Sequence, residues 1–320
     1  MSSALVIVAG LAGLLVGADL LVRGGAALAS RLGVRPIVIG LTVVALGTSL
    51  PELAVGIDAV RQGSPGLAVG NIVGANLVNI LFVLGLSALI RPIAFERRTL
   101  RFDLPAMAAA SLALWLLALD GSLSRVEGVI LGLGGAAYTA GIIWTSRQES
   151  APVHADYASH SGRTTPRGRR GLLLRALNVI AGIGLLFLGA EFLVDGSTEI
   201  ARSLEVSEAT IGLTVIALGT CAPELVTTIT STVRGDRDIA IGNLLGSSVY
   251  NVAVILGITV MTAPAEVQIP DSIVAADLLV LAVVALITVP VLLSGQRVSR
   301  LEGGAFVTAY LGYLVWLILV

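Results

Sequence analysis

Apolar stretches long enough to cross a membrane run along nearly the whole chain, and they constrain its fold more than any other feature. A helix needs roughly 20 mostly apolar residues to cross a bilayer. Lipid offers the backbone no hydrogen-bond partners, so a spanning segment must satisfy its own polar groups. The ten expected spans are residues 4–22, 34–60, 66–89, 104–119, 125–145, 172–194, 206–233, 238–262, 273–293 and 301–320.

Composition supports the membrane class. Only 13% of the 320 residues are charged, against about 25% in a soluble globular chain. Ten spans leave no room for a soluble domain, and the single cysteine, Cys221, excludes an internal disulfide or a cysteine-based metal cluster. Residues 4–22 lack the basic start and the small-residue cleavage site of a signal peptide and contain Asp19, so we expect a retained first span.

The arginines predict the orientation, because cytoplasmic loops of membrane proteins are enriched in basic residues. If the N-terminus lies outside, sixteen arginines fall in inner loops and three in outer loops. We therefore expect a multi-pass protein of the cell membrane with both termini extracytoplasmic. The long polar segment 146–171 is then a cytoplasmic linker.

The chain contains an internal repeat. Residues 40–79 match residues 212–251 without a gap, at an offset of 172, with 18 of 40 positions identical. The same offset pairs Asp19 with Glu191. The pattern predicts an all-α polytopic membrane protein with two five-helix repeats, residues 1–145 and 172–320. Because five is odd, the second repeat must be inverted in the membrane, which is the layout of many secondary transporters.

A proline and a carboxylate lie together in the middle of two of these spans. The first copy reads Gly-Thr-Ser-Leu-Pro-Glu at residues 47–52 and the second Gly-Thr-Cys-Ala-Pro-Glu at residues 219–224. Pro51 and Pro223 cannot donate a backbone hydrogen bond, so we expect broken helices with freed carbonyls. A charge at the centre of a span costs about 2.5–3.5 kcal/mol on insertion scales, and Glu52 and Glu224 place one there twice, so we expect a function.

These groups form an oxygen-rich set that suits a hard cation. Calcium takes about 6–8 oxygen ligands. The two carboxylates can supply up to four, and the carbonyls or hydroxyls at Thr48 and Thr220 can supply most of the rest. The following spans carry further polar side chains on one helical stripe each, namely Asn71 and Asn79 in the first copy and Asn243, Ser247 and Asn251 in the second. We expect Asn71 and Asn243 to be the pair with a structural role.

The paired motifs resemble the alpha-repeats of the sodium/calcium exchangers, in the prokaryotic branch of the calcium:cation antiporter superfamily. The resemblance is specific over residues 40–90 and 212–262 and extends to the whole chain through the ten-span layout. It implies an antiporter that exchanges calcium for sodium by alternating access, with those ions as substrates, the lipid bilayer as its surroundings and no other cofactor. The metal-ligating residues that it implies are Glu52, Glu224, Thr48, Thr220, Ser49, Asn79, Asn251 and Ser247.

Two positions depart from the family pattern. Cys221 stands where a hydroxyl is expected, and a thiol is a poor ligand for a hard ion. Asn251 stands where some relatives carry Asp, so the centre has two carboxylates rather than three. The ion ratio and the coupling ion therefore stay open at this point.

Three alternatives remain from the residues alone. The first is exchange of calcium or another cation for protons, and the second is an ion channel built on the same oxygens. The third, a membrane enzyme, is disfavoured because both histidines, His154 and His160, lie in the polar linker. Nothing in the sequence points to a nucleic acid or to an obligate protein partner.

Overall fold

The computed structural model describes residues 3–148, 169–205, 215 and 217–319. Apart from four two-residue strands, the elements are helical. In the first half they are α1 (Ser3–Leu32), α2 (Pro36–Ile39), η1 (Gly40–Val44), α3 (Ala45–Thr48), α4 (Leu50–Arg61), α5 (Pro65–Leu77), η2 (Val78–Val83), α6 (Leu84–Ile90), β1 (Ile93–Ala94), α7 (Arg97–Arg101), α8 (Asp103–Leu117), η3 (Ala118–Asp120), β2 (Ser122–Leu123) and α9 (Arg125–Gln148). In the second they are α11 (Arg169–Ser203), α13 (Ala217–Thr220), α14 (Ala222–Arg234), α15 (Arg237–Tyr250), η5 (Asn251–Leu256), α16 (Gly257–Thr262), β3 (Val267–Gln268), η6 (Ile273–Asp277), α17 (Leu278–Gly295), β4 (Arg297–Val298) and α18 (Arg300–Leu319).

Eight helical segments of the described chain are long and apolar enough to cross a membrane. Two of them form the centre of the bundle. In their most apolar stretches, 78% of the residues of Pro65–Ile90 and 83% of those of Arg237–Thr262 are buried. The seventh expected span falls partly on residues 206–214 and 216, outside the described residues. The tenth, residues 301–320, corresponds to helix α18, which is not among the eight. The count of ten spans and the inversion of the repeats therefore remain predictions.

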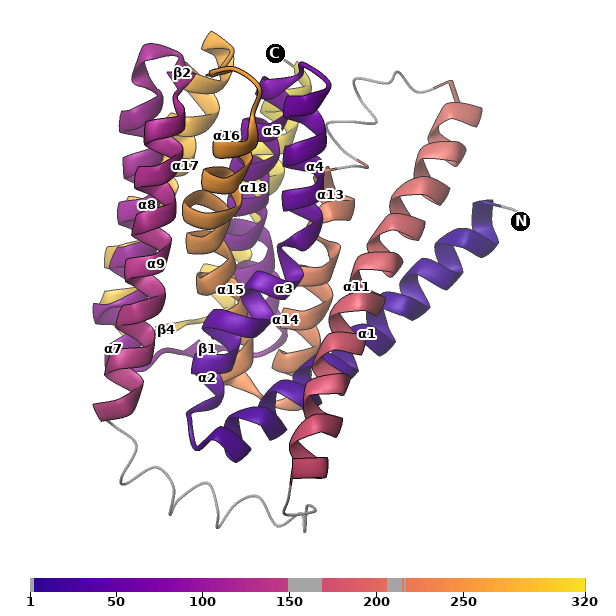
Figure 1. The fold of residues 1–320 in the computed structure, drawn as a ribbon, viewed down its shortest axis with the longest axis vertical. Helices are drawn as coiled ribbons and strands as arrows, with labels where there is room; N and C mark the ends of the chain where they lie inside the picture. The colour runs from indigo at the N-terminus through magenta and orange to yellow at the C-terminus, as the bar shows by residue number, and fades with distance from the viewer. Residues whose placement is uncertain (1–2, 149–168, 206–214, 216, 320) are drawn as a thin grey trace.

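The chain breaks at the two expected prolines. Ser49 interrupts the helix between α3 and α4, with φ −85° and ψ 8°. Cys221 does the same between α13 and α14, with φ −80° and ψ −2°. In Figure 1 the first broken helix rises from α2 to α4, whereas the second descends from α13 to α14. The two copies of the motif thus run in opposite directions through the molecule.

The helices that follow the broken ones widen into π-helical turns at matching places. η2 begins at Val78, and η5 begins at Asn251. π-helical turns are rare and are found mostly as single turns near functional sites. The widening places Asn79 and Asn251 in these irregular turns rather than on the regular helical stripe that the sequence predicts.

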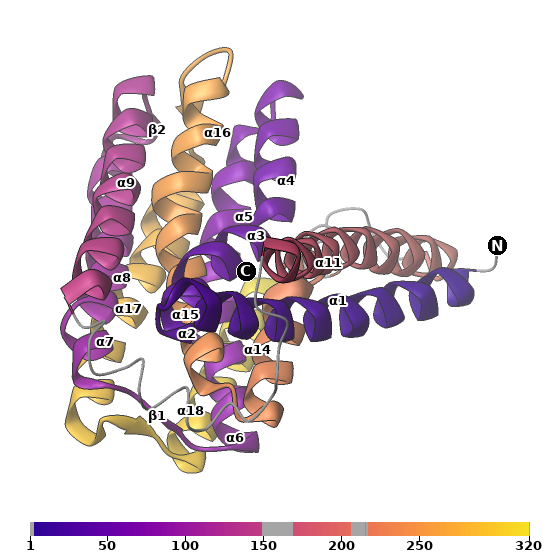
Figure 2. The ribbon, with the colours of Figure 1, turned by 60° about the horizontal axis from the view of Figure 1, so that its bottom comes forward.

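Helices α1 and α11 form a closely packed antiparallel pair along one flank of the bundle (Figures 1 and 2). Their backbones touch at glycines. A Cβ added at Gly17 would lie 2.8 Å from the backbone nitrogen of Leu186, and one added at Gly189 would lie 2.7 Å from that of Leu14. Small residues allow such contacts between membrane helices. The pair is therefore joined over most of its length.

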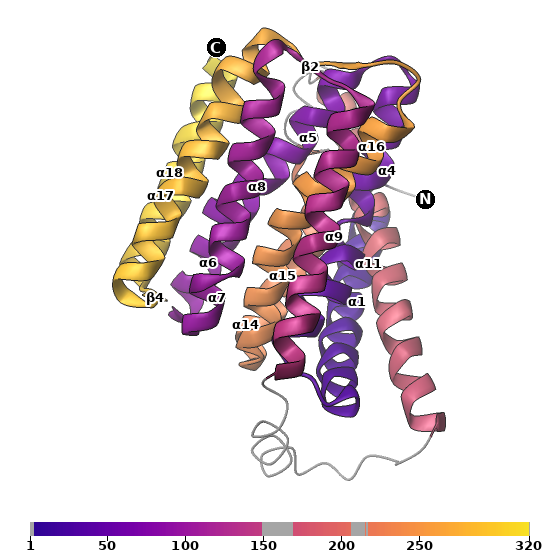
Figure 3. The same ribbon diagram turned by 60° about the vertical axis from the view of Figure 1, so that its left-hand side comes forward.

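Short antiparallel strands join the two halves at both ends of the bundle. β1 pairs with β4, and β2 pairs with β3. The helix after β2 and the helix after β4 begin with the same cap, because Ser124 and Ser299 bond the carboxylates of Glu127 and Glu302 at 2.7 Å through their backbone nitrogens. Figure 3 shows α17 and α18 beside α8 on the flank of the bundle away from α1 and α11.

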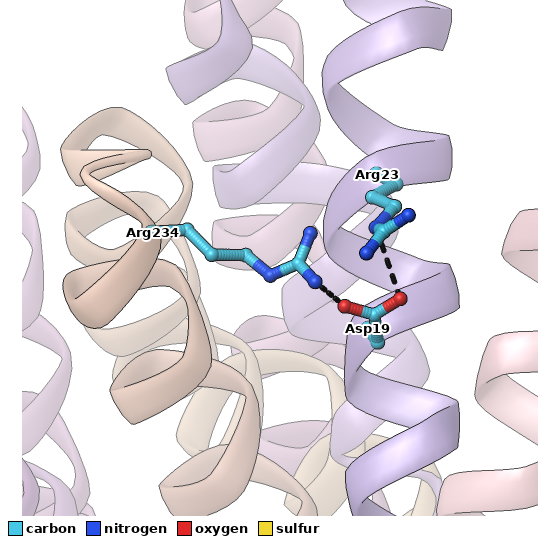
Figure 4. Close-up of polar contacts among 3 residues, drawn as sticks. All are labelled: Asp19, Arg23 and Arg234. Carbon is cyan, nitrogen blue, oxygen red and sulfur yellow. Dashed lines mark ion pairs between the residues drawn. The ribbon is translucent and has the colours of Figure 1, made fainter.

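An ion pair ties α1 to the end of α14. The carboxylate of Asp19 contacts Arg234 in the last turn of α14 and also Arg23, one turn further along α1, at 2.9 Å (Figure 4). Asp19 and Arg234 are about 30% exposed. The Asp19 carboxylate thus links the flanking pair to α14, the helix whose first turn contains Glu224.

Candidate ion-binding site

Two acidic side chains from the two halves lie together in the interior of the bundle. Glu52 is in the first turn of α4 and Glu224 is in the first turn of α14. They are 0% and 1% exposed, and they are close enough to interact electrostatically. Both lie at helix N-termini, where the backbone carries partial positive charge that favours an anion. The break before each proline thus puts a carboxylate where the helix can support its charge.

The carboxylate oxygens have few partners in the protein. The hydroxyl of Ser49 donates to Oε1 of Glu224 at 3.2 Å. On the Glu52 side the neighbour is Cys221, the residue that matches Ser49 in the repeat, and its thiol is a weak donor. Within the described chain, Oε2 of Glu224 and both Glu52 oxygens lack a hydrogen-bond partner. Three buried acceptor atoms are therefore left for an occupant of the site.

Hydroxyls around the breaks bond to asparagines across the two halves. Thr48 Oγ1 donates to Oδ1 of Asn243 at 3.0 Å, and Thr220 Oγ1 donates to Oδ1 of Asn71 at 3.3 Å. Thr48 also lies 3.3 Å from the hydroxyl of Ser247. The two asparagines expected to be structural thus hold the hydroxyls expected to be ligands.

The remaining predicted ligands are also buried. Asn79 and Asn251 are 1% and 0% exposed, and among the described residues no group bonds either atom of their side-chain amides. Unpartnered buried amides are costly and call for an explanation. An ion or water that these amides face would provide one.

Two polar side chains that the sequence reasoning passed over have the same property. Asn76 and Thr227 are fully buried, and their side-chain polar atoms find no partner in the part of the chain that the structure describes. Asn76 aligns with Ser248, a polar pair that the repeat could have revealed. Thr227 aligns with Val55 and leaves no such trace in the repeat.

All eight predicted ligands lie in the buried interior. Their side chains offer carboxylate, hydroxyl and amide oxygens from both halves, the set that hard cations prefer. Among the described residues, no group of three or more His, Cys, Asp or Glu side chains lies together in a way that could hold a metal ion. A cation held here would depend on two carboxylates and on neutral oxygens.

Comparisons with known proteins give the family. The model of the sodium/calcium exchanger protein family matches residues 2–144 and 175–319. The chain is 32% identical to the putative antiporter CaxA of Alkalimonas amylolytica over 96% of both chains. It is 34% identical to the inner membrane protein YrbG of Escherichia coli over 99% of this chain and 96% of that one.

A sodium/calcium exchanger and its solved relatives are similar over the same length. The sodium/calcium exchanger MaX1 of Methanosarcina acetivorans is 28% identical over 97% of both chains. Solved structures of the sodium-calcium exchanger NCX_Mj superimpose with a TM-score of 0.83, 26% identity and 98% coverage of both chains. The likeness spans the flanking pair, both broken helices and the buried carboxylates. This chain is a membrane protein of the sodium/calcium exchanger family, a family of transporters rather than enzymes.

Proposed function

We propose that the protein is a secondary antiporter that exchanges calcium for sodium across the cell membrane by alternating access. The observation that carries the proposal is the pair of buried carboxylates, three of whose oxygens no described residue bonds. An isolated charge in an apolar interior is very costly unless an opposite charge compensates it. The site therefore requires a cation or protons whenever it is closed to water.

Glu52, Glu224 and the surrounding oxygens match the needs of calcium. Calcium takes about 6–8 oxygens at 2.3–2.6 Å. The two carboxylates would provide up to four, and others would come from the buried side chains of Thr48, Thr220, Asn79 and Asn251. Their two negative charges are neutralised by one calcium ion or by two sodium ions. Ser49 and Ser247 supply further hydroxyls for the smaller charge of sodium.

Competition for the same carboxylates would couple the two ions. Calcium and sodium cannot occupy these oxygens together without excess positive charge, and the empty site would carry two uncompensated charges in the membrane interior. Only an occupied carrier would then change the side to which it opens. The names of the relatives support this pair of ions, since MaX1 and NCX_Mj are both called sodium/calcium exchangers.

The proposal includes two inverted five-helix repeats, ten spans in all, joined by the segment 146–171. Antiparallel packing of α1 on α11 and the opposite courses of the broken helices support the inversion (Figure 1). An exchange site at the interface of such repeats is the common arrangement in secondary transporters.

Calcium uptake into proteoliposomes tests the function. We expect uptake when the vesicles are loaded with sodium and diluted into sodium-free buffer, with saturation in external calcium. Uptake driven by a pH gradient but not by a sodium gradient would replace sodium with protons as the coupling ion. Uptake that does not saturate and needs no counter-ion would identify a channel.

A further inference from the structure

Thr228 lies one helical turn after Glu224 and takes part in none of the predicted ligand contacts. It is 1% exposed and sits on α14, with its hydroxyl against the next helix, α15. Nδ2 of Asn243 donates to Oγ1 of Thr228 at 2.9 Å and to the backbone oxygen of Glu224 at 3.3 Å. Both bonds hold the nitrogen side of the Asn243 amide against α14.

The second of these bonds fixes which way the amide faces. A backbone carbonyl only accepts hydrogen bonds, so the group that faces the Glu224 carbonyl must be the nitrogen. The oxygen of Asn243 then faces the opposite way, toward α3. There it accepts the hydrogen of Thr48 at 3.0 Å. The hydrogen-bond chain therefore has one direction, from Thr48 through Asn243 to α14.

That direction determines what Thr48 can offer to a cation. A hydroxyl binds a metal ion through its lone pairs, so its hydrogen must point elsewhere. Around Thr48 the acceptors are Oδ1 of Asn243, the backbone oxygen of Ala45 at 3.2 Å and the carboxylate of Glu224. The hydroxyl of Ser247 lies 3.3 Å away and donates to the same Ala45 oxygen at 3.3 Å. The lone pairs of Thr48 thus stay available for an ion.

We propose that Thr228 is a positioning residue of the exchange site, which acts through Asn243 to keep Thr48 a hydrogen-bond donor. The inference rests on the proposed function, because it concerns the affinity of the site for its cation. Without the Thr228 hydroxyl, one strong acceptor for the amide is lost and only the longer bond to the Glu224 carbonyl remains. The amide is then held less firmly against α14, and its oxygen becomes a less well-placed acceptor, so that the Thr48 hydrogen turns more readily toward the cation.

The other half of the site lacks this arrangement. Gly56 occupies the position that corresponds to Thr228, and Nδ2 of Asn71 has no partner among the described residues, although Oδ1 of Asn71 accepts from Thr220 at 3.3 Å. A side chain added there would have to displace Thr259, since a Cβ at Gly56 would lie 2.7 Å from Oγ1 of Thr259. The amide is thus oriented from two sides in one half and from one side in the other.

The test compares three variants in the sodium-driven uptake assay. Thr228→Val keeps the shape of the side chain and removes the acceptor, and we expect it to raise the calcium KM about tenfold, as the loss of one buried hydrogen bond allows. Thr228→Ser restores the hydroxyl, and we expect its KM within about twofold of the parent chain. The matched control is Thr232→Val on the same helix, whose hydroxyl bonds only the backbone oxygen of Thr228 at 2.8 Å. Its KM should stay unchanged.

Calcium binding is measured separately on the purified chain, as the calcium concentration that half-maximally raises the melting temperature in detergent. The tenfold shift of Thr228→Val, with rescue by Thr228→Ser, should recur there. Equal calcium affinity in Thr228→Val and the parent overturns the positioning role and leaves the exchanger proposal standing. Equal weakening in the Val and Ser variants also overturns it, because only packing then matters. If calcium stabilises the chain but no sodium-driven uptake occurs, the exchanger proposal is contradicted, and the shift in calcium affinity still decides the positioning role. If neither calcium stabilisation nor uptake occurs, the exchanger proposal and the positioning role are both overturned.

Discussion

At the scale of single residues, the proposed exchange depends on the two glutamates. Glu52 and Glu224 are buried, interact electrostatically and keep three oxygens without partners in the described structure. Their neighbours differ, because Ser49 bonds Glu224 whereas Cys221 lies beside Glu52. The two halves thus supply the same charge at these positions but different hydrogen-bond donors beside it.

Replacing either glutamate with glutamine should abolish calcium transport. Glu52→Gln and Glu224→Gln each remove one of two negative charges, and one remaining charge cannot balance a divalent cation in an apolar interior. Asn71→Ala should only weaken uptake, because it removes a partner of Thr220 and no charge. The measurement is initial calcium uptake under a sodium gradient. Normal uptake by both glutamine variants would show that the ions bind elsewhere.

The repeat made much of this site predictable, and its limits follow from the same source. The sequence predicts a helix break followed by a carboxylate at Pro51 and Glu52, and again at Pro223 and Glu224. Thr228 could not be found in this way, because its counterpart in the first half is Gly56. The π-helical turns at Asn79 and Asn251 were not predictable either, since the local sequence carries no mark of an extra residue per turn.

At the scale of elements, an ion pair links α1 to α14. Asp19 and Arg234 are 215 positions apart in the chain, so no sequence pattern connects them, and only the folded arrangement shows that they pair (Figure 4). The corresponding positions in the other half are Glu191 and Gln62, which cannot form an ion pair. The ion pair between α1 and α14 therefore has no equivalent at Glu191 and Gln62.

Neutralising Asp19 should loosen α1 from α14. Asp19→Asn leaves Arg234 about 29% exposed without its carboxylate partner, and the loss of one member of a partly buried pair should destabilise the contact by about 1–3 kcal/mol. Hydrogen exchange measured by mass spectrometry should rise in α1 and in the last turn of α14. Glu191→Gln is the matched control and should leave both segments unchanged. Unchanged exchange in Asp19→Asn would mean that apolar packing alone holds α1.

The seam between α1 and α11 should tolerate no larger side chain. Gly17→Val places a branched side chain where even a Cβ would lie 2.8 Å from backbone, so we expect a loss of folded protein and a melting temperature lower by several degrees. Gly184→Val on α11 is the control, because nothing lies within 4 Å of its added Cβ. Equal melting temperatures for the two variants would contradict the close packing of the seam.

At the scale of the whole molecule, composition and arginine placement predicted a helical membrane protein and its orientation. The helical fold and eight membrane-length helices are confirmed within the described residues. Orientation depends on the bilayer rather than on contacts within the chain. It therefore stays a prediction that a labelling experiment must decide.

A single cysteine in the linker would test the orientation. In a Cys221→Ser background, Ser159→Cys should react with a membrane-impermeant maleimide only after cells are permeabilised, because the segment 146–171 is expected in the cytoplasm. Ser122→Cys, in β2 at the opposite expected face, should react in intact cells. The reverse labelling pattern would place both termini in the cytoplasm.

The glycine seam has a further mechanical consequence. At Gly17 and Gly189 backbone contacts backbone, so at these points no side chain lies between α1 and α11 that could rearrange to absorb a relative shift. The two helices would therefore move as one rigid body. This body contacts both broken helices. A movement that opened the carboxylates to one side of the membrane would therefore also change the contacts on the other side.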